Sequence, residues 1–152
     1  MLSRVRTIAD LQFGRGIGVL LFPDSCRFIT SRRGGVRQVL LDGKRLATLR
    51  AHDGRLTLGL AGGKRLHEAL PGQTGRVELR EDVVPFIAAG KNLFCRHVTD
   101  ADPGIHAGDE VIVTDGDGRF IAIGEAVVSG TEMMACETGM AVSVRHGMQK
   151  EE

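Results

Sequence analysis

Apolar residues near the start of the chain recur at helical spacing. In the stretch SRVRTIADLQFG, Val5, Ile8, Ala9 and Gln12 mark successive helical turns, and Ser3 stands where an N-cap is expected. We therefore expect a short helix at the N-terminus.

After Pro23 the pattern changes to the alternation of an antiparallel sheet, and four runs carry it: CRFITS, VRQVLL, RLATLRA and RLTLGL. Asp42-Gly43 and Asp53-Gly54 separate the last three runs, and each pair is typical of a type I′ hairpin turn with positive φ at both central residues. One face of this sheet should be apolar. The opposite face should be basic, through Arg37, Arg45, Arg50 and Arg55.

A short amphipathic helix, GGKRLHEAL, and a linker, PGQTG at residues 71–75, follow the sheet. In the second half of the chain the expected strands and helices follow one another more closely. Its expected strands are RVEL, NLFCRHV, EVIVT, RFIAIGEAVV and MAVSVRHG, and its expected helices are EDVVPFIAAG, ending at Gly90, and GTEMMACE. A hairpin turn is expected at residues 115–118. Five strands and two short helices are enough to close a small mixed barrel.

The fold class predicted from this order is α+β. An antiparallel sheet with short helices occupies residues 1–75, and a mixed β pseudo-barrel occupies residues 76–148. A chain of 152 residues is too short for a large catalytic barrel.

Composition favours an ordinary globular protein, with 42% hydrophobic and 26% charged residues. No apolar run approaches the ~20 residues that cross a bilayer, and no signal peptide is visible at the N-terminus. We expect a cytoplasmic protein without a membrane partner.

Cysteine and histidine are scattered without the spacing of a metal site. No C-x-x-C pair occurs among Cys26, Cys95 and Cys136, and no two of the five histidines stand at helical ligand spacing. We therefore expect reduced, buried thiols, no metal and no cofactor.

The net charge of +1 hides an asymmetry between the two parts of the chain. Residues 1–80 contain 15 Lys and Arg against 6 Asp and Glu, a balance of +9, whereas residues 81–152 contain 5 against 13, a balance of −8. The basic part suits an anionic partner, although attraction between the two parts is an alternative explanation.

No motif indicates catalysis. FGRGIG lacks the preceding strand and the spacing of a dinucleotide site, and DGDG lacks the later ligands of a calcium loop. Cys95 and His97 would share one face of a strand, but no third group orients them. We assign no catalytic residue.

The arginine-rich first half instead suits phosphate. Guanidinium groups around Gly34-Gly35 can contact phosphate bidentately, and the candidate residues are Arg32, Arg33, Arg37, Lys44 and Arg45. A solvated basic turn is the alternative. The chain has no Trp or Tyr and its six Phe fall mostly at core-like positions, so recognition of duplex shape and phosphate is favoured over base stacking.

Residues 76–147 resemble a PUA domain, the small RNA-binding pseudo-barrel of RNA-modifying enzymes. The resemblance rests on a helix ending in Gly90-Lys91, a strand leading to DPGIHAGDEV, the run AIGEA and the final GMAVSVRHG. The first half, through QFG and SRRGGVRQVLLDGKRLATLRAHDGRLTLGL, resembles the domain that precedes PUA in archaeal tRNA-guanine transglycosylases.

This resemblance implies an RNA surface on the first PUA helix, the following strand and the last strand, at Lys91, Asn92, Arg96, Arg145 and His146. It also implies that catalytic aspartates and zinc belong to a separate barrel, which this chain lacks.

Three hypotheses follow for the function. The first is a non-catalytic protein that binds structured RNA, with tRNA as the RNA that the resemblance implies. The second is the RNA-binding subunit of a two-chain archaeosine-type transglycosylase or related tRNA-modifying enzyme, with a separate catalytic subunit as partner. The third is a small-molecule enzyme whose site would gather Cys95, His97 and a carboxylate.

Overall fold

The computed structural model describes residues 1–149, which form two compact units. Unit 1 runs from Met1 to Ala69, and unit 2 begins at Leu70. No helix in the described range is long and apolar enough to cross a membrane.

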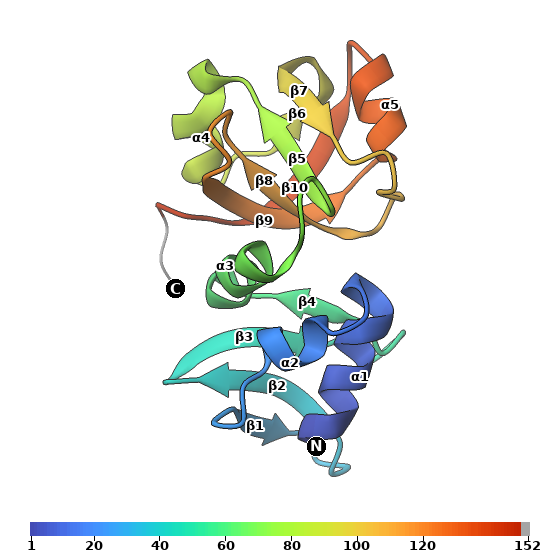
Figure 1. Ribbon diagram of the computed structural model, residues 1–152, viewed down its shortest axis with the longest axis vertical. Coiled ribbons are helices and arrows are strands. Elements are labelled where there is room, and N and C mark those ends of the chain that lie inside the picture. The colour runs from blue at the N-terminus through green and yellow to red at the C-terminus, as the bar shows by residue number, and fades with distance from the viewer. Residues whose placement is uncertain (150–152) are drawn as a thin grey trace. The chain divides into compact units, whose positions relative to one another are not determined.

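Unit 1 combines three helices with one four-stranded sheet (Figure 1). The sheet is antiparallel and its strands follow chain order, which confirms the predicted meander. Its elements are α1 (Leu2–Phe13), α2 (Ile17–Leu21), β1 (Arg27–Thr30), β2 (Val36–Leu41), β3 (Lys44–Leu49), β4 (Leu56–Leu58) and α3 (Leu60–Ala69).

Helix α1 is the predicted N-terminal helix, but it begins earlier than expected. Its N-cap position is Met1, which makes no side-chain capping bond, and Ser3 lies inside the first turn, where its carbonyl accepts from the Thr7 hydroxyl. The assignment of Ser3 as the N-cap was therefore wrong. Val5 and Ala9, one turn apart, are fully buried and anchor the helix.

The two Asp-Gly pairs differ. Asp42 and Gly43 both have positive φ, 52° and 79°, as the type I′ prediction requires. At the second pair only Gly54 has positive φ, because the connection is a longer loop. There the Asp53 carboxylate accepts hydrogen bonds from the backbone N–H of Arg55 and from the guanidinium of Arg50. These bonds lower the pKa of Asp53, and the bond from the Arg55 N–H has the largest effect.

The predicted apolar face of the sheet is present, but only two of the four arginines predicted for the basic face lie on its strands. Val39 pairs with Ala47 and Ala47 with Leu58, and all three are buried. Arg37 lies on β2 and Arg45 on β3, whereas Arg50 and Arg55 belong to the loop between β3 and β4 rather than to a strand. The prediction of strand positions was therefore wrong for Arg50 and Arg55.

Unit 2 is built on one mixed six-stranded sheet in the order β6-β10-β9-β8-β5-β7. Strands β5 and β8 are parallel, and the other neighbouring pairs are antiparallel. Its elements are β5 (Arg76–Leu79), η1 (Glu81–Val83), α4 (Val84–Ala88), β6 (Leu93–Phe94), η2 (Cys95–His97), β7 (Val98–Ala101), β8 (Glu110–Thr114), β9 (Phe120–Ala126), α5 (Gly130–Ala135) and β10 (Met140–Gly147). The sheet curls into a nearly closed barrel (Figure 1), so the predicted fold class is confirmed.

The expected strand NLFCRHV is interrupted. A 3-10 turn at Cys95–His97 separates β6 from β7, so unit 2 has six strands where five were expected. The premise that Cys95 and His97 share one strand face was therefore wrong.

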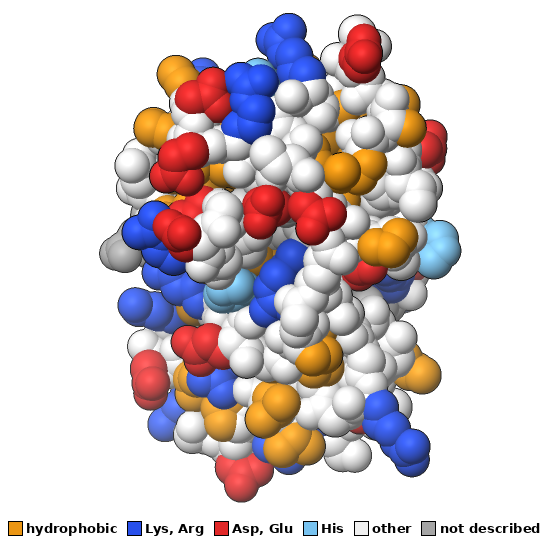
Figure 2. Space-filling view, turned by 45° about the horizontal axis from the view of Figure 1, so that its top comes forward, with side chains coloured by type: hydrophobic (Ala, Val, Ile, Leu, Met, Phe, Trp, Pro, Cys, Tyr) orange, Lys and Arg blue, Asp and Glu red, His pale blue; other side chains and the backbone are white. Residues whose placement is uncertain are grey.

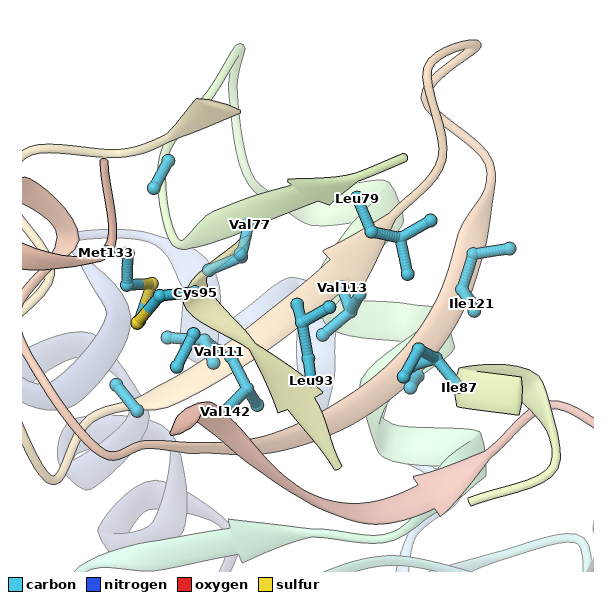
Figure 3. Close-up of a cluster of buried hydrophobic side chains, with 14 of the residues drawn as sticks. Val77, Leu79, Ile87, Leu93, Cys95, Val111, Val113, Ile121, Met133 and Val142 are labelled. Carbon is cyan, nitrogen blue, oxygen red and sulfur yellow. The ribbon is translucent and has the colours of Figure 1, made fainter. Parts of the chain in front are cut away.

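Apolar side chains from the sheet and the short helices fill the barrel (Figure 3). Cys95 is only 4% exposed and lies beside Met133 in this core, and burial raises the pKa of its thiol. The thiol is thus a core group with little nucleophilic character.

Candidate nucleic-acid interface

Lys91 is presented by a well-formed helix C-terminus. Gly90 takes a φ of 102°, its N–H donates to the carbonyl of Ile87, and the N–H of Lys91 donates to the carbonyl of Phe86. This pair of bonds is the Schellman motif, which needs a residue without Cβ at the left-handed position. The backbone of Lys91 is fixed, and its side chain is exposed.

The next two residues tie this turn to the barrel. The side-chain oxygen of Asn92 accepts the backbone N–H of Val144 on β10 at 2.9 Å, and Leu93 is fully buried. The role of Asn92 that the structure displays is therefore to anchor the turn.

Arg96 is exposed on η2, beside a shallow groove of about 190 Å³. The groove is lined by Phe94, Arg96 and the segment from Glu137 to Gly139. It is held in place by the bond from the Cys95 N–H to the Gly139 carbonyl.

Two aromatic side chains are exposed in the same region. Phe86 on α4 is 60% exposed and Phe94 on β6 is 41% exposed. The expectation that phenylalanines sit in core-like positions was wrong for both. In α4, Ile87 and Ala88 face the core, and the helical period then places Phe86 on the outside. This helical spacing was the sequence signal that could have predicted the exposure of Phe86.

We name residues Gly90–Arg96, with Phe86, the 90–96 surface. Its two cations, Lys91 and Arg96, differ from the other described cations of unit 2, whose side chains form ion pairs or hydrogen bonds. Arg80 pairs with Asp82, Arg119 with Asp115 and Asp117, and Arg145 with Glu110.

The guanidinium of Arg76 donates to the carbonyls of Leu70, Gly72 and Thr74. Between Leu70 and Gln149, Lys91 and Arg96 are the cations whose side chains form no hydrogen bond or ion pair. Acidic side chains lie among the basic ones on the face in Figure 2.

Arg145, a predicted RNA contact, has an internal partner. Its guanidinium makes a bidentate pair with Glu110, with Nη1 2.9 Å from Oε2, and the Glu110 side chain is only 5% exposed. A buried carboxylate without that partner would be costly. The guanidinium thus links β10 to β8, the two strands on either side of β9.

The histidines near this surface are partly covered. His146 is half-buried on β10, opposite Ile123. Burial lowers the pKa of His97, and Arg80 and Arg96 lower it further. His97 is therefore neutral at pH 7 and adds no positive charge there.

The basic candidates of unit 1 fall into two groups. Arg32 and Arg33 are exposed in the turn between β1 and β2, close to Arg37 at the start of β2. Lys44 and Arg45 lie at the other end of that strand, where Leu41 pairs with Lys44. The two ends of β2 are five residue steps of ~3.3 Å apart. The basic candidates of unit 1 therefore do not form one cluster.

No group of three His, Cys, Asp or Glu side chains within residues 1–149 is arranged to hold a metal ion.

Two family models match the chain. Residues 3–73 match the patch-forming domain C2 of tRNA-guanine transglycosylase, and residues 75–148 match the PUA domain.

Curated relatives match both parts at once. The tRNA-guanine(15) transglycosylase of Thermococcus kodakarensis is 43% identical over 146 residues, and that of Methanobrevibacter smithii is 37% identical over 150 residues. These stretches are 96% and 98% of this chain but 25% and 23% of the relatives. The chain thus spans about a quarter of the length of the proteins it matches.

Solved structures share the fold. A hypothetical protein from Pyrococcus horikoshii aligns over 98% of this chain and 90% of its own, with a TM-score of 0.75 and 24% identity. A conserved PUA domain protein from Thermoplasma acidophilum aligns over 98% and 89%, with a TM-score of 0.66 and 21% identity. At these identities the likeness establishes the fold alone.

A chain of an archaeal box H/ACA ribonucleoprotein complex aligns over 55% of this chain and 27% of its own, with a TM-score of 0.50 and 25% identity. Together the domain families and relatives support an RNA-binding role. The chain consists of a patch-forming domain C2 of the tRNA-guanine transglycosylase family followed by a PUA domain, and it corresponds to the C-terminal portion of the archaeal tRNA-guanine(15) transglycosylases.

Proposed function

We propose that the protein binds structured RNA, and specifically tRNA, without catalysing a reaction by itself. The observation that carries the proposal is the 90–96 surface, where Lys91 and Arg96 have no carboxylate partner among residues 1–149, whereas Arg80 and Arg145 do. Unpaired cations on a rigid backbone bind phosphate without first breaking an ion pair.

The same surface offers more than charge. Phe86 and Phe94 present exposed rings on which an unpaired base can stack, and stacking of this kind contributes ~1–3 kcal/mol per base. The choice of tRNA follows the curated relatives, whose name states that they are tRNA-guanine(15) transglycosylases.

A second contact in the proposal is the β1–β2 turn of unit 1. Arg32, Arg33 and Arg37 are exposed and form no hydrogen bond or ion pair through their side chains within the described chain. Lys44 and Arg45, at the far end of β2, are weaker candidates. Arg145 and His146 stay in the proposed site as supports of β10 rather than as phosphate contacts.

The test is the salt dependence of tRNA affinity, measured by filter binding or fluorescence anisotropy. Contact with three to five phosphates predicts a log–log slope of about −2 to −4.5. An unstructured RNA of the same length serves as competitor and should bind more weakly. A flat salt response, or equal affinity for the unstructured RNA, would contradict the proposal.

A second candidate function is the RNA-binding subunit of a two-chain tRNA-modifying enzyme of the archaeosine type. The observation in its favour is the match to about a quarter of the transglycosylase relatives. Under this proposal a catalytic partner acts on the tRNA that this chain holds. Transglycosylase activity that appears only when the two chains are combined would support it, and activity of this chain alone would contradict both candidates.

A further inference from the structure

A polar pocket of about 440 Å³ lies within unit 2. It is lined by residues of β7, β5 and β8, which are neighbours in the sheet, and by Gly72, Gln73 and Gly118 from the adjoining loops. Its volume is in the range of small-ligand sites. The pocket shares no lining residue with the groove beside Arg96, so it is a separate candidate site.

Three side chains of the pocket stand in one row across the strands. Glu78 on β5 pairs with Asp100 on β7 and with Thr114 on β8. Residues next to them in the chain belong to the barrel core: Val77, Ala101 and Val113. Because side chains alternate along a strand, the row points to the outer face of the sheet, and its members are ~5 Å apart from strand to strand.

The two carboxylates of this row have no cationic partner. Glu78 accepts the Thr99 hydroxyl at 2.6 Å, and Asp100 accepts the Gln73 amide and the N–H of Ala101. Neither carboxylate forms an ion pair within residues 1–149. Like charges directly opposite each other on neighbouring strands destabilise a sheet. A cation bound between Glu78 and Asp100 would therefore stabilise it.

The basic side chain of the pocket, Arg76, is directed to the linker. Its guanidinium donates to the backbone carbonyls of Leu70, Gly72 and Thr74. The pocket thus has two carboxylates against one guanidinium that already serves as a donor to the backbone.

Thr114 adds a hydroxyl that no other group uses. The residue is only 3% exposed and lines the pocket, and its side chain forms no hydrogen bond within the described chain. Side-chain polar groups as buried as this one usually have a partner. An N–H group of a ligand in the pocket would meet this acceptor without breaking an existing bond.

We propose that the pocket binds a guanidinium group, which donates to Glu78, Asp100 and Thr114 together. A guanidinium has N–H groups along both edges of a plane, so it can reach two facing carboxylates, and it is less strongly hydrated than an ammonium. No three His, Cys, Asp or Glu side chains among the described residues are arranged for a metal ion, which favours an organic cation. The inference does not depend on the RNA-binding proposal.

The experiment is an NMR titration of the isotope-labelled full chain with methylguanidinium and with the peptide acetyl-Gly-Arg-Gly-amide. The backbone N–H signals of Glu78, Asp100 and Thr114 should shift and saturate, with a Kd of about 10 mM or below. Tighter binding of the peptide would identify an arginine of another protein as the source of the guanidinium, and tighter binding of methylguanidinium a free small molecule.

Three results of the titration would overturn the proposal. The first is the absence of saturable shifts at these residues. The second is tighter binding of the matched lysine peptide, acetyl-Gly-Lys-Gly-amide. The third is displacement of methylguanidinium by an equal concentration of magnesium chloride, because the ligand would then be a metal ion.

Glu78→Gln with Asp100→Asn removes both charges and keeps acceptors for the hydrogen bonds from Thr99 and Gln73. It should weaken peptide binding roughly tenfold or more, and it should raise the thermal midpoint of the free protein because the facing charges are gone. Glu68→Gln with Glu81→Gln, an equal change of charge at exposed positions, is the matched control. Equal weakening by both pairs, or a lower midpoint with unchanged affinity, would contradict the proposal.

Thr114→Val decides the question if that double variant unfolds. It should weaken peptide binding about threefold or more without lowering the thermal midpoint, since the hydroxyl has no partner in the free protein, and Thr114→Ser should restore binding. Wild-type affinity in Thr114→Val would overturn the proposed contact. Affinity for tRNA is measured separately, and its absence in the wild type would count against RNA binding while leaving the guanidinium result to stand on its own.

Discussion

In unit 2, Arg80, Arg119 and Arg145 are each held by a carboxylate, whereas in unit 1 the arginines of the β1–β2 turn have no such partner. Unit 2 is rich in acidic residues, and four of them, Asp82, Glu110, Asp115 and Asp117, pair with its own arginines. Among the described residues of unit 2, the side chains of Lys91 and Arg96 form no hydrogen bond or ion pair, and both residues lie on the 90–96 surface. The comparison teaches that the net charge of a domain does not locate a phosphate site, since pairing decides which cations remain available.

The largest expected effect concerns the paired arginines. Arg145→Glu places a second carboxylate against the buried side chain of Glu110, and losing one partner of a buried pair costs about 3 kcal/mol of unfolding free energy or more. Urea denaturation followed by circular dichroism measures the loss.

Two controls accompany that variant. Arg80→Glu, at an exposed pair with Asp82, should leave the denaturation midpoint nearly unchanged. Glu110→Leu combined with Arg145→Met should recover much of the stability, because a buried ion pair can be replaced by apolar groups of similar size. If Arg145→Glu were as stable as wild type, Arg145 would be available for RNA after all.

A smaller effect is expected at Asp115. Burial raises the pKa of this carboxyl, but the N–H groups of Arg119 and Asp117 and the Arg119 guanidinium outweigh burial and lower it. Asp115→Ala should cost about 2 kcal/mol at pH 7, because two turn N–H groups lose their acceptor.

The pH dependence of this contribution has a definite sign. Because the folded-state pKa lies below the unfolded one, the stabilisation is present above pH ~4 and is lost as pH falls through the folded pKa. Thermal melts at pH 7 and pH 3 should therefore show a smaller decline for Asp115→Ala than for wild type. Asp117→Ala, at an exposed carboxylate, is the control. Identical declines would contradict the role of Asp115.

The smallest effect is expected in unit 1. Arg32→Glu with Arg33→Glu should weaken tRNA binding about threefold to tenfold, through loss of phosphate contacts, and should leave the fold intact. Lys64→Glu with Arg4→Glu makes an equal change of charge at exposed helix positions of the same unit. Equal weakening by both variants would mean that unit 1 acts through net charge alone.

The sequence was sufficient for features that depend on neighbouring residues. The stop of α4 at Gly90 and the type I′ turn at Asp42-Gly43 each follow from residues adjacent in the chain. Most of the order of strands and helices follows from the same local patterns; the exceptions are α2, where no helix was expected, and the division of NLFCRHV into β6 and β7.

Features that depend on distant contacts were not predictable in this way. Arg145 resembled a surface cation, and its partner Glu110 lies 35 residues away in the chain. Phe94 resembled a core residue, and only the packing of β6 onto the barrel places its ring outside. For Phe86, by contrast, the period of α4 carried a local signal of exposure. The break at Cys95–His97 lies in a segment without the Gly, Pro, Asn or Asp that would signal a turn.

The central claim is that the unpaired cations of the 90–96 surface hold the RNA, and charge reversal in the full chain tests it most directly. Lys91→Glu and Arg96→Glu, singly and together, are compared with Arg80→Glu, a nearby cation held by Asp82. The account predicts that the double variant loses about tenfold or more in tRNA affinity, that its salt slope becomes ~1.4 to 1.8 shallower, and that Arg80→Glu changes both much less. Equal losses for Lys91→Glu, Arg96→Glu and Arg80→Glu, at unchanged stability, would contradict it.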